Sequence, residues 1–336
     1  MNPDQTVPGM NKVVSPRKTP VERLAALSTQ ASDLWVKRDD LTHPLYGGNK
    51  VRKLSHILRE AKSRGFEKIV TIGAAGSHHV LATTIFGELC GLKVEAAMVP
   101  QPDNPHVEEN LRAGLGHGLK PFIARSYATV PFVVMSRLGE KTMYVPVGGS
   151  SVLGAMGYVD ASLELAQQIR AGEMPEPDIV IVTLGSGGTV AGIAAGLAHA
   201  GIGAKVIGVV VAEPPWAIEM TARRLTRKCA HKIGVPPEKR PDRDLVIDTR
   251  YLGKGYGHPT PAAEAATKRA AEVGLTLDPT YTSKAFAAAL DLVQEGAAKT
   301  ILYWHTLSSA PMAPLLEGAP DEVPERFKKL MLGDSK

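Results

Sequence analysis

Cysteine is scarce in this sequence, with only Cys90 and Cys229 among 336 residues. Two cysteines this far apart form neither a disulfide framework nor a metal site. Cys90 lies in an apolar, helix-like stretch, where a free thiol behaves as a small core residue. The chain therefore has no covalent or metal cross-links to stabilise it, and we expect it to rely on an ordinary hydrophobic core.

Aromatic residues, basic blocks and long apolar runs are also missing. Aromatics make up 5% of the residues, and the formal net charge of +5 comes from lysines and arginines spread along the chain. This distribution disfavours nucleic-acid binding, which requires clustered basic and stacking residues. No apolar run approaches the length of a membrane span, and residues 1–20 are polar and rich in proline. We therefore expect a cytoplasmic protein with a small-molecule partner and no membrane or nucleic-acid partner.

Apolar runs alternate with helical patterns along most of the chain, which predicts an α/β fold with mostly parallel sheets flanked by helices. The first set of predicted elements has the strands 68–72, 94–99, 120–123 and 142–147 and the helix 80–90. The second set has the helices 155–170 and from Thr189 onward, and the strands 179–184, 206–212 and 300–305. A chain of 336 residues is long enough for two domains. We expect a small α/β domain over residues 51–160 and a large one over residues 1–50 and 161–336.

Lys50 follows two glycines in the run Leu-Tyr-Gly-Gly-Asn-Lys-Val-Arg-Lys-Leu, directly after the strand-like stretch 33–40. Glycines let the backbone approach a bulky neighbour, and Lys50 then opens an amphipathic helix. A lysine in the first turn opposes the helix dipole, unless its amine is neutral or bound as an imine beside an anion. The alternative is a solvated surface lysine in a basic cluster with Arg52 and Lys53.

A glycine-rich turn follows the predicted buried strand 179–184 and leads into a helix. Its sequence is Gly185-Ser186-Gly187-Gly188-Thr189. Backbone N–H groups, the helix N-terminus and two hydroxyls make this turn a cradle for a phosphate monoester, and a tight turn without a ligand is the alternative. The spacing fits neither a Rossmann dinucleotide loop nor a Walker loop. An imine-forming lysine together with a phosphate cup of this kind points to pyridoxal 5'-phosphate.

Three further clusters complete the pattern. Residues 73–79 follow a strand and open a helix whose start suits a substrate carboxylate. Residues 256–260 form a turn, and residues 277–285 lead into a helix near the end of the last strand at 303–306. With these motifs, the chain resembles the fold type II, tryptophan-synthase-like pyridoxal-phosphate enzymes. Within them it is similar to the branch of D-cysteine desulfhydrase and 1-aminocyclopropane-1-carboxylate deaminase. The motifs, in order, are Gly-Gly-Asn-Lys-x-Arg-Lys-Leu, Gly-Ser-Gly-Gly-Thr, Tyr-Gly-x-Pro-Thr and Asp-Pro-x-Tyr-Thr-x-Lys-Ala. The resemblance implies a two-domain homodimer whose large domain binds pyridoxal 5'-phosphate.

Residue roles follow from the resemblance, motif by motif. Lys50 would form the imine and act as the base at the substrate Cα, and Ser77 would contact the substrate carboxylate. Tyr256 and Tyr281 would line the substrate side of the cofactor ring, with Tyr281 the more catalytic of the two. The resemblance assigns further cofactor contacts to Asn49, His78, Ser186, Gly187, Gly188, Thr189, Thr282 and Thr306. It implies no metal, and the adjacent residues His78 and His79 do not share a helix face, as a metal pair would need to.

Two threonines bear on the reaction. The cyclopropane deaminases are expected to have Glu at the position of Thr282 and Leu at that of Thr306. A carboxylate near the pyridine nitrogen keeps that nitrogen protonated, whereas a hydroxyl leaves it neutral and makes a milder electron sink. We therefore expect α,β-elimination of the D-cysteine desulfhydrase type, which yields a 2-oxo acid, ammonia and the leaving group.

Several alternatives remain open. They are the cyclopropane deaminase, a lyase acting on cysteate, serine or diaminopropionate, and a non-catalytic metabolite-binding protein. His78 stands where the family has Asn, and Leu307-Ser308 where it has Gly-Gly. Both differences lie at the expected cofactor or substrate wall, so they affect which substrate fits. The retained lysine and tyrosines argue against a non-catalytic protein, and the failed glycine spacing argues against an NAD-dependent enzyme.

Overall fold

The computed structural model describes residues 14–102, 105–126 and 128–332. They form two compact units. Unit 1 consists of the described residues of the ranges 1–16, 53–149 and 310–336, and unit 2 consists of residues 17–52 and 150–309. The predicted large domain included residues 14–16 and 310–332, which belong to unit 1, where strand β12 (Met331–Leu332) pairs with β5 (Gln101–Pro102). The predicted small domain included residues 150–160, which belong to unit 2.

Unit 2 is built on a six-stranded sheet in the order β1-β2-β11-β8-β9-β10, and all neighbouring strands are parallel except the pair β1 and β2. The strands are β1 (Val21–Arg23), β2 (Asp33–Arg38), β8 (Ile179–Leu184), β9 (Lys205–Val210), β10 (Val246–Asp248) and β11 (Thr300–His305). The helices are α6 (Val152–Arg170), α7 (Gly188–Ala200), α8 (Pro215–Lys232), α9 (Pro241–Asp244), α10 (Pro261–Ala271) and α11 (Thr282–Gln294). The short 3-10 helix η2 (Asp39–Leu41) follows β2.

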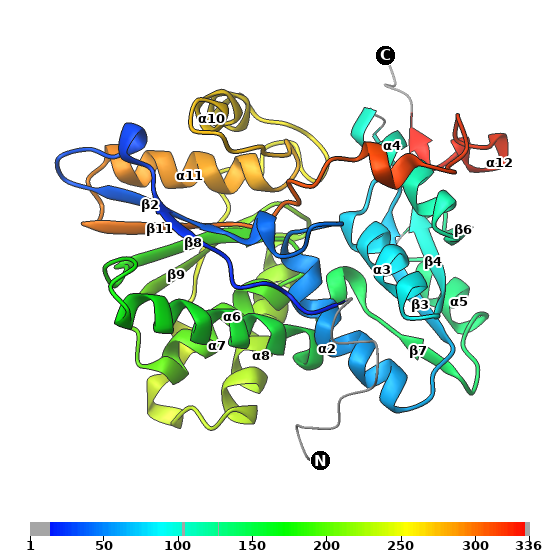
Figure 1. Cartoon of the computed structure of the whole chain (residues 1–336), viewed down its shortest axis with the longest axis horizontal. Coiled ribbons are helices and arrows are strands. Elements are labelled where there is room, and N and C mark those ends of the chain that lie inside the picture. Colours follow the sequence, from blue (N-terminus) through cyan, green and yellow to red (C-terminus); the bar gives the residue numbers. More distant parts are fainter. Residues whose placement is uncertain (1–13, 103–104, 127, 333–336) are drawn as a thin grey trace. The chain divides into compact units, whose positions relative to one another are not determined.

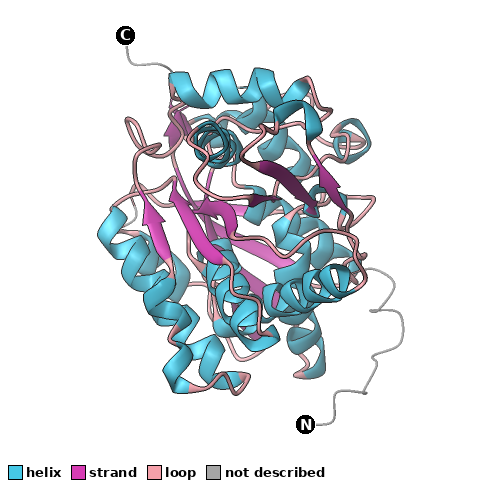
Figure 2. Cartoon of the chain, turned by 90° about the vertical axis from the view of Figure 1, so that its left-hand side faces the viewer, coloured by secondary structure: helices cyan, strands magenta, loops and turns pink. Residues whose placement is uncertain are grey.

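Helices cover both faces of this sheet. Figure 1 shows α10 and α11 on one face and α6, α7 and α8 on the other, and Figure 2 shows the strands as a layer between them. In β8, Ile179 and Ile181 pack with Phe286 of α11, whereas Val180 and Val182 pack with residues of α6 and α7. A strand that is buried on both faces is typical of a parallel sheet, which explains its continuous apolar sequence.

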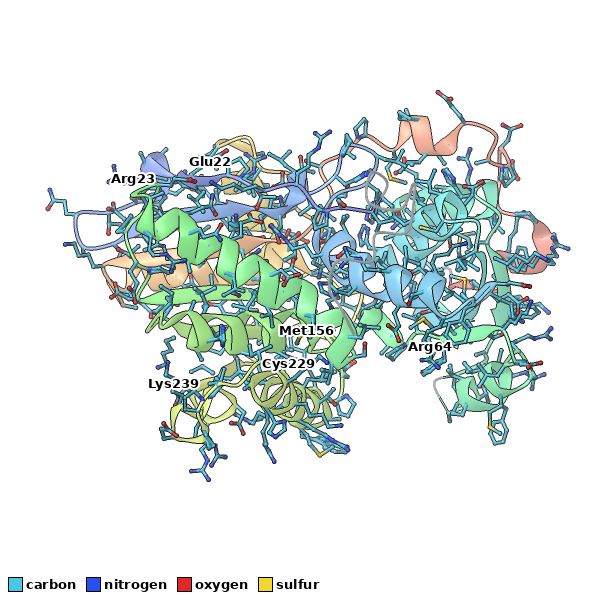
Figure 3. All side chains as sticks on the ribbon, turned by 60° about the horizontal axis from the view of Figure 1, so that its bottom comes forward. Glu22, Arg23, Arg64, Met156, Cys229 and Lys239 are labelled. Atoms are coloured by element: carbon cyan, nitrogen blue, oxygen red, sulfur yellow. The ribbon has the colours of Figure 1, made fainter. Side chains whose placement is uncertain are left out.

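The Ala/Gly-rich helix α7 packs closely against α6. A Cβ atom on Gly192 would lie 2.3 Å from the backbone oxygen of Ala155, so only glycine permits this contact. Next to it, Met156 of α6 and Cys229 of α8 belong to one apolar cluster, and both are labelled in Figure 3. Burial raises the pKa of the Cys229 thiol to about 12, so this cysteine has a packing role.

Unit 1 contains a four-stranded parallel sheet in the order β6-β4-β3-β7. Its strands are β3 (Lys68–Ala74), β4 (Lys93–Val99), β6 (Lys120–Ile123) and β7 (Thr142–Tyr144). Its helices are α3 (His78–Leu89), α4 (Pro105–Gly116), α5 (Val130–Met135) and α12 (Glu325–Lys328), and α2 (Asn49–Ser63) begins in unit 2 and continues into unit 1. The predicted α/β fold with mostly parallel sheets is confirmed. No helix in the described ranges has the length and apolar character needed to cross a bilayer.

Candidate active site

Lys50 lies in the first turn of α2, where the chain turns tightly against the ends of β2 and β11. The Gly48 N–H donates to the backbone oxygen of Asp39 at 2.9 Å, and the Asn49 N–H donates to that of Thr306 at 3.0 Å. Gly48 has φ +81°, and a Cβ atom there would lie 2.6 Å from the same Thr306 oxygen. A side chain at Gly48 would therefore clash with the backbone of Thr306. The hydrogen bonds of Gly48 and Asn49 to neighbouring backbone fix the start of α2 and with it Lys50.

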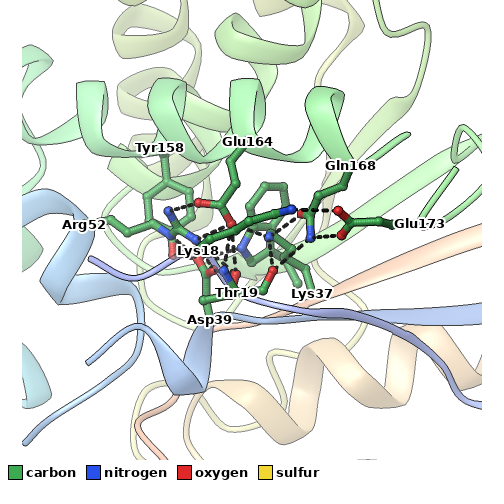
Figure 4. A network of polar contacts seen from close by, with 10 residues as sticks. Lys18, Thr19, Lys37, Asp39, Arg52, Tyr158, Glu164, Gln168 and Glu173 are labelled. Carbon is green, nitrogen blue, oxygen red and sulfur yellow. Dashed lines mark hydrogen bonds and ion pairs between the residues drawn. The ribbon is translucent and has the colours of Figure 1, made fainter. Parts of the chain in front are cut away.

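A buried polar network fixes the same helix from the side. Figure 4 shows the Asp39 carboxylate and the Arg52 guanidinium at its centre. Arg52 donates to both Asp39 oxygens, from Nε at 2.9 Å and from Nη2 at 2.7 Å, and to Glu164 of α6 at 3.0 Å. The charges of Asp39 and Glu164 raise the pKa of Arg52 against the opposing effect of burial. Because Arg52 lies two residues after Lys50, this ion-pair network sets the position of the first turn of α2.

The Lys50 amine is half-buried and has its own short chain of contacts. Its Nζ donates to Asn49 Oδ1 at 2.8 Å, and Asn49 Nδ2 donates to Thr189 Oγ1 at 3.1 Å. Burial lowers the pKa of Lys50 to about 8, with the charge of Asp278 acting in the opposite direction. Lys50 forms no ion pair with any residue that the structure describes. It is therefore not the solvated surface lysine of the alternative interpretation, and its amine is readily neutral.

The glycine-rich turn lies at the other end of this chain of contacts. Gly187 has φ +89° and provides no side chain to cap α7, which begins at Gly188. Ser150, which the sequence analysis did not assign to the site, contacts this turn: its Oγ lies 2.7 Å from Ser186 Oγ and accepts from the Gly188 N–H at 3.0 Å. Hydroxyls of Ser150, Ser186 and Thr189 thus surround the N-terminus of a 13-residue helix. Such an arrangement suits a phosphate group.

The two predicted tyrosines meet beside the same turn. The Tyr256 and Tyr281 hydroxyls form a hydrogen bond, and their rings pack edge to face with centroids 5.6 Å apart. Tyr281 lies next to Gly185, since a Cβ atom on Gly185 would be 3.8 Å from Tyr281 Cε1. Lys284 of α11 donates to the backbone oxygens of Leu252 and Gly255, at 2.8 and 3.2 Å, and so supports the loop that carries Tyr256.

A second buried carboxylate, Asp278, organises the turn before α11. Its oxygens accept from the Tyr281 N–H at 2.6 Å and from the Thr282 hydroxyl at 2.7 Å. The sequence analysis did not select Asp278, although an aspartate four residues before a threonine at a helix start is a usual turn signal. The Thr282 hydroxyl is therefore bonded to a carboxyl group and is not isolated.

The end of β11 closes this group of residues. Thr306 is buried and bonded through its backbone oxygen to Asn49, as described above. His305 is fully buried, and its Nε2 has no hydrogen-bond partner in the described chain. Burial lowers the pKa of His305, so its ring is neutral. An unpartnered buried nitrogen next to Thr306 makes this a polar wall of the site.

Ser77 and His78 belong to unit 1. Ser77 Oγ accepts from the Val80 N–H at 3.3 Å and caps α3, where the sequence placed a helix start. His78 Nε2 lies 2.9 Å from Nε2 of His106 in α4, so one of these nitrogens donates to the other. His79 is buried, and its Nε2 bonds to the Thr71 hydroxyl at 2.8 Å, which is a packing role. Among the described residues, no three His, Cys, Asp or Glu side chains form a group that could hold a metal ion.

Most of the predicted site residues come together within unit 2. Side-chain hydrogen bonds join Lys50, Asn49 and Thr189. The backbone oxygen of Thr306 accepts from the Asn49 N–H, and Tyr281 lies next to Gly185 at the start of the glycine turn. A neutralisable amine linked to a phosphate-binding helix terminus fits pyridoxal phosphate, which carries an aldehyde and a phosphate. Ser150 and Asp278 are the members that the sequence analysis missed.

Comparison with known proteins gives an independent result. A family model described as "Pyridoxal-phosphate dependent enzyme" matches residues 14–306. A protein of Pyrococcus horikoshii that carries the provisional name 1-aminocyclopropane-1-carboxylate deaminase is 32% identical over 302 residues, which cover 87% of this chain and 89% of that protein. A D-cysteine desulfhydrase of Salmonella paratyphi A is 33% identical over 290 residues, 82% of this chain and 86% of that one. A solved structure described as an ACC deaminase homologue is 28% identical, has a TM-score of 0.77 and covers 93% of this chain and 100% of its own.

Proposed function

The chain belongs to the pyridoxal-phosphate dependent enzymes, and from this premise we propose that it is a lyase that eliminates a β-substituent from a small amino acid. The products would be a 2-oxo acid, ammonia and the leaving group, as in a D-cysteine desulfhydrase. The main support is the chain of hydrogen bonds from Lys50 through Asn49 to Thr189. It connects an amine of lowered pKa to the phosphate-binding turn within one compact unit.

We assign the cofactor contacts as follows. Lys50 would attach the cofactor, and Asn49 would orient the amine through the bond from Nζ to Oδ1. The phosphate would be held by the hydroxyls and backbone N–H groups of Ser150, Ser186, Gly187, Gly188 and Thr189. Thr282 and Thr306 would form a polar wall, and the assignment of His78 rests on the family resemblance alone.

When bound, the cofactor withdraws electrons from the substrate Cα, which makes loss of the α-proton possible. The Lys50 amine takes this proton at Nζ, because burial keeps a large fraction of the amine neutral near pH 8. The bond between Cβ and the leaving group then breaks as a double bond forms between Cα and Cβ. We assign to the Tyr281 hydroxyl, which is bonded to that of Tyr256, the transfer of a proton to the leaving group. Water hydrolyses the released enamine to the 2-oxo acid and ammonia. The contact of Ser77 with the substrate carboxylate rests on the family resemblance alone.

A second candidate is ring-opening deamination of 1-aminocyclopropane-1-carboxylate. One structural observation favours it: the Thr282 hydroxyl is bonded to the buried Asp278 carboxylate, so an anion lies close to the position where the deaminases are expected to have Glu. The names of the relatives support both reactions. We keep β-elimination as the main proposal because Thr282 and Thr306 stand where the deaminases are expected to have Glu and Leu.

The test is a substrate panel assayed for 2-oxo acid and ammonia. It includes D- and L-cysteine, D-serine, cysteate, diaminopropionate and 1-aminocyclopropane-1-carboxylate. We expect pyruvate and ammonia from at least one β-substituted amino acid, and no product from the Lys50→Ala variant. Formation of 2-oxobutyrate from the cyclopropane acid alone would replace the main proposal with the second candidate.

Assembly and location remain part of the proposal. The family resemblance implies a homodimer, and we propose a cytoplasmic location. Sedimentation of the holoenzyme tests the first point, with one species of twice the chain mass of 35.7 kDa expected. Fractionation of the producing cells tests the second.

A further inference from the structure

Asp278 is a buried carboxylate in the turn before α11. Its side chain is 4% exposed, and it forms no ion pair with any residue in the described ranges. Its oxygens accept from the Tyr281 N–H at 2.6 Å, the Thr282 N–H at 3.2 Å and the Thr282 hydroxyl at 2.7 Å. All of these donors come from its own turn, so the carboxylate shapes the start of α11. Its charge opposes the lowering of the Lys50 and Lys284 pKa by burial.

The Thr282 hydroxyl is restricted by this carboxylate. A threonine hydroxyl has one hydrogen to donate and two lone pairs that accept. The Asp278 N–H donates to Oγ1 at 2.8 Å, which occupies one lone pair. The hydroxyl donates its hydrogen to Asp278 Oδ2 at 2.7 Å. One lone pair remains, so any ligand atom that meets Thr282 Oγ1 must bring its own hydrogen.

Two tyrosines, a histidine and two lysines interact electrostatically with Asp278. Burial first, and the Asp278 charge second, raise the pKa of the Tyr46 and Tyr303 hydroxyls, so both stay neutral. Burial lowers the pKa of His305, which also stays neutral although Asp278 opposes the shift. The nearby amines are Lys50, with a pKa of about 8, and Lys284, which already donates to two backbone oxygens.

We propose that Asp278 is a positioning residue that acts through Thr282 to keep the ring nitrogen of the bound cofactor protonated. The proposal rests on the function proposed above, in which Thr282 contacts the cofactor. It reverses the expectation from sequence that a hydroxyl at this position leaves the ring nitrogen neutral. A protonated ring is the stronger electron sink, and this serves both β-elimination and ring opening.

The experiment is nitrogen-15 NMR of the holoenzyme reconstituted with cofactor labelled at the ring nitrogen. In the wild-type enzyme at neutral pH we expect the chemical shift of a protonated pyridine nitrogen. Asp278→Asn should move it to the neutral range, because an amide nitrogen in place of Oδ2 donates to Thr282 Oγ1 and frees the hydroxyl hydrogen. Thr282→Val should do the same by removing the acceptor, and Thr282→Ser should leave the shift unchanged.

Asp291→Asn is the matched control. It makes the same substitution later in α11, at an exposed carboxylate that accepts from the Tyr251 hydroxyl at 2.5 Å, and should not move the signal. A neutral ring nitrogen in the wild-type holoenzyme would overturn the proposal even if no variant folds. Failure of the proposed function looks different, because the holoenzyme would still give a ring signal but would form no 2-oxo acid from any β-substituted amino acid of the substrate panel.

Discussion

Unit 2 contains two buried carboxylates, Asp39 and Asp278, whose surroundings differ. Asp39 accepts from the side chains of Thr19, Arg52, Tyr158 and Trp304, which come from four separate parts of the chain. It is paired with a buried guanidinium at 2.7 Å. Asp278 accepts only from its own turn and has no cation in the described structure.

The difference separates a structural role from a functional one. A saturated, ion-paired carboxylate such as Asp39 joins distant segments and has no remaining capacity for a ligand. An unpaired carboxylate such as Asp278 retains its charge and influences groups that can still bind something, including Lys50 and Thr282. Substitutions near Asp39 should therefore reduce stability, and substitutions around Lys50 and Asp278 should change cofactor chemistry.

The largest effect is expected for Lys50→Ala. Because Lys50 is both the proposed attachment point and the base, the variant should lose about a thousand-fold or more in kcat. Its unfolding free energy should change by less than about 1 kcal/mol, because the amine makes one hydrogen bond and no ion pair. Urea titration with an activity assay measures both. Lys18→Ala, which removes an exposed ion pair with Glu173, should leave both values near wild type.

Asp39→Asn should have the opposite effect: a large loss of unfolding free energy rather than a loss of kcat alone. Removing the charge takes from the buried Arg52 the carboxylate at 2.7 Å, which is expected to cost about 3–5 kcal/mol of unfolding free energy. Tryptophan fluorescence reports this directly, because Trp35, Trp216 and Trp304 all belong to unit 2. The control is Asp33→Asn, whose ion pair with Arg23 is solvent-exposed and should contribute about 1 kcal/mol or less. Equal losses in the two variants would contradict the structural role of Asp39.

Cofactor uptake by the apoenzyme should depend on pH through Lys50. The neutral amine is the nucleophile, and burial lowers its pKa from the usual value to about 8. The uptake rate should therefore rise about tenfold per pH unit below pH 8 and level off above it. Stopped-flow absorbance measures the rate. A plateau reached only above pH 10 would show an amine with an unshifted pKa.

Gly188→Ala should have the smallest effect. Its Cβ atom would lie 2.7 Å from Ser150 Oγ, so that hydroxyl must move away from the turn. We expect about 1–2 kcal/mol weaker cofactor binding, which is roughly a tenfold higher dissociation constant. The control is Gly203→Ala, where the nearest atom to the new Cβ would be at 3.7 Å. Equal affinities of the two variants would show that the turn does not hold the phosphate.

Much of this arrangement could be predicted from sequence because it depends on local patterns. The strands 179–184 and 300–305 were predicted with their observed bounds, since strands buried on both faces are continuously apolar. The glycine turn and Lys50 were identified because their motifs are contiguous. Helix α6 begins at Val152, three residues before the predicted start, because the Ser151 side chain caps it.

The parts that could not be predicted depend on residues distant in the chain. Ser150 contacts Ser186 across 36 positions, and Trp304 contacts Asp39 across 265. Nothing in the local sequence distinguishes Asp39 from its neighbour Asp40. The same holds for Asp278, whose missing cation is visible only once the fold surrounds it.

The central claim is that Lys50 is the residue that carries the cofactor. Borohydride reduction of the holoenzyme makes the attachment permanent, and peptide mass spectrometry then identifies the modified lysine. The account predicts one cofactor per chain, on the peptide that contains Lys50. A cofactor on another lysine, such as Lys53 or Lys284, or no modified peptide at all, would contradict it.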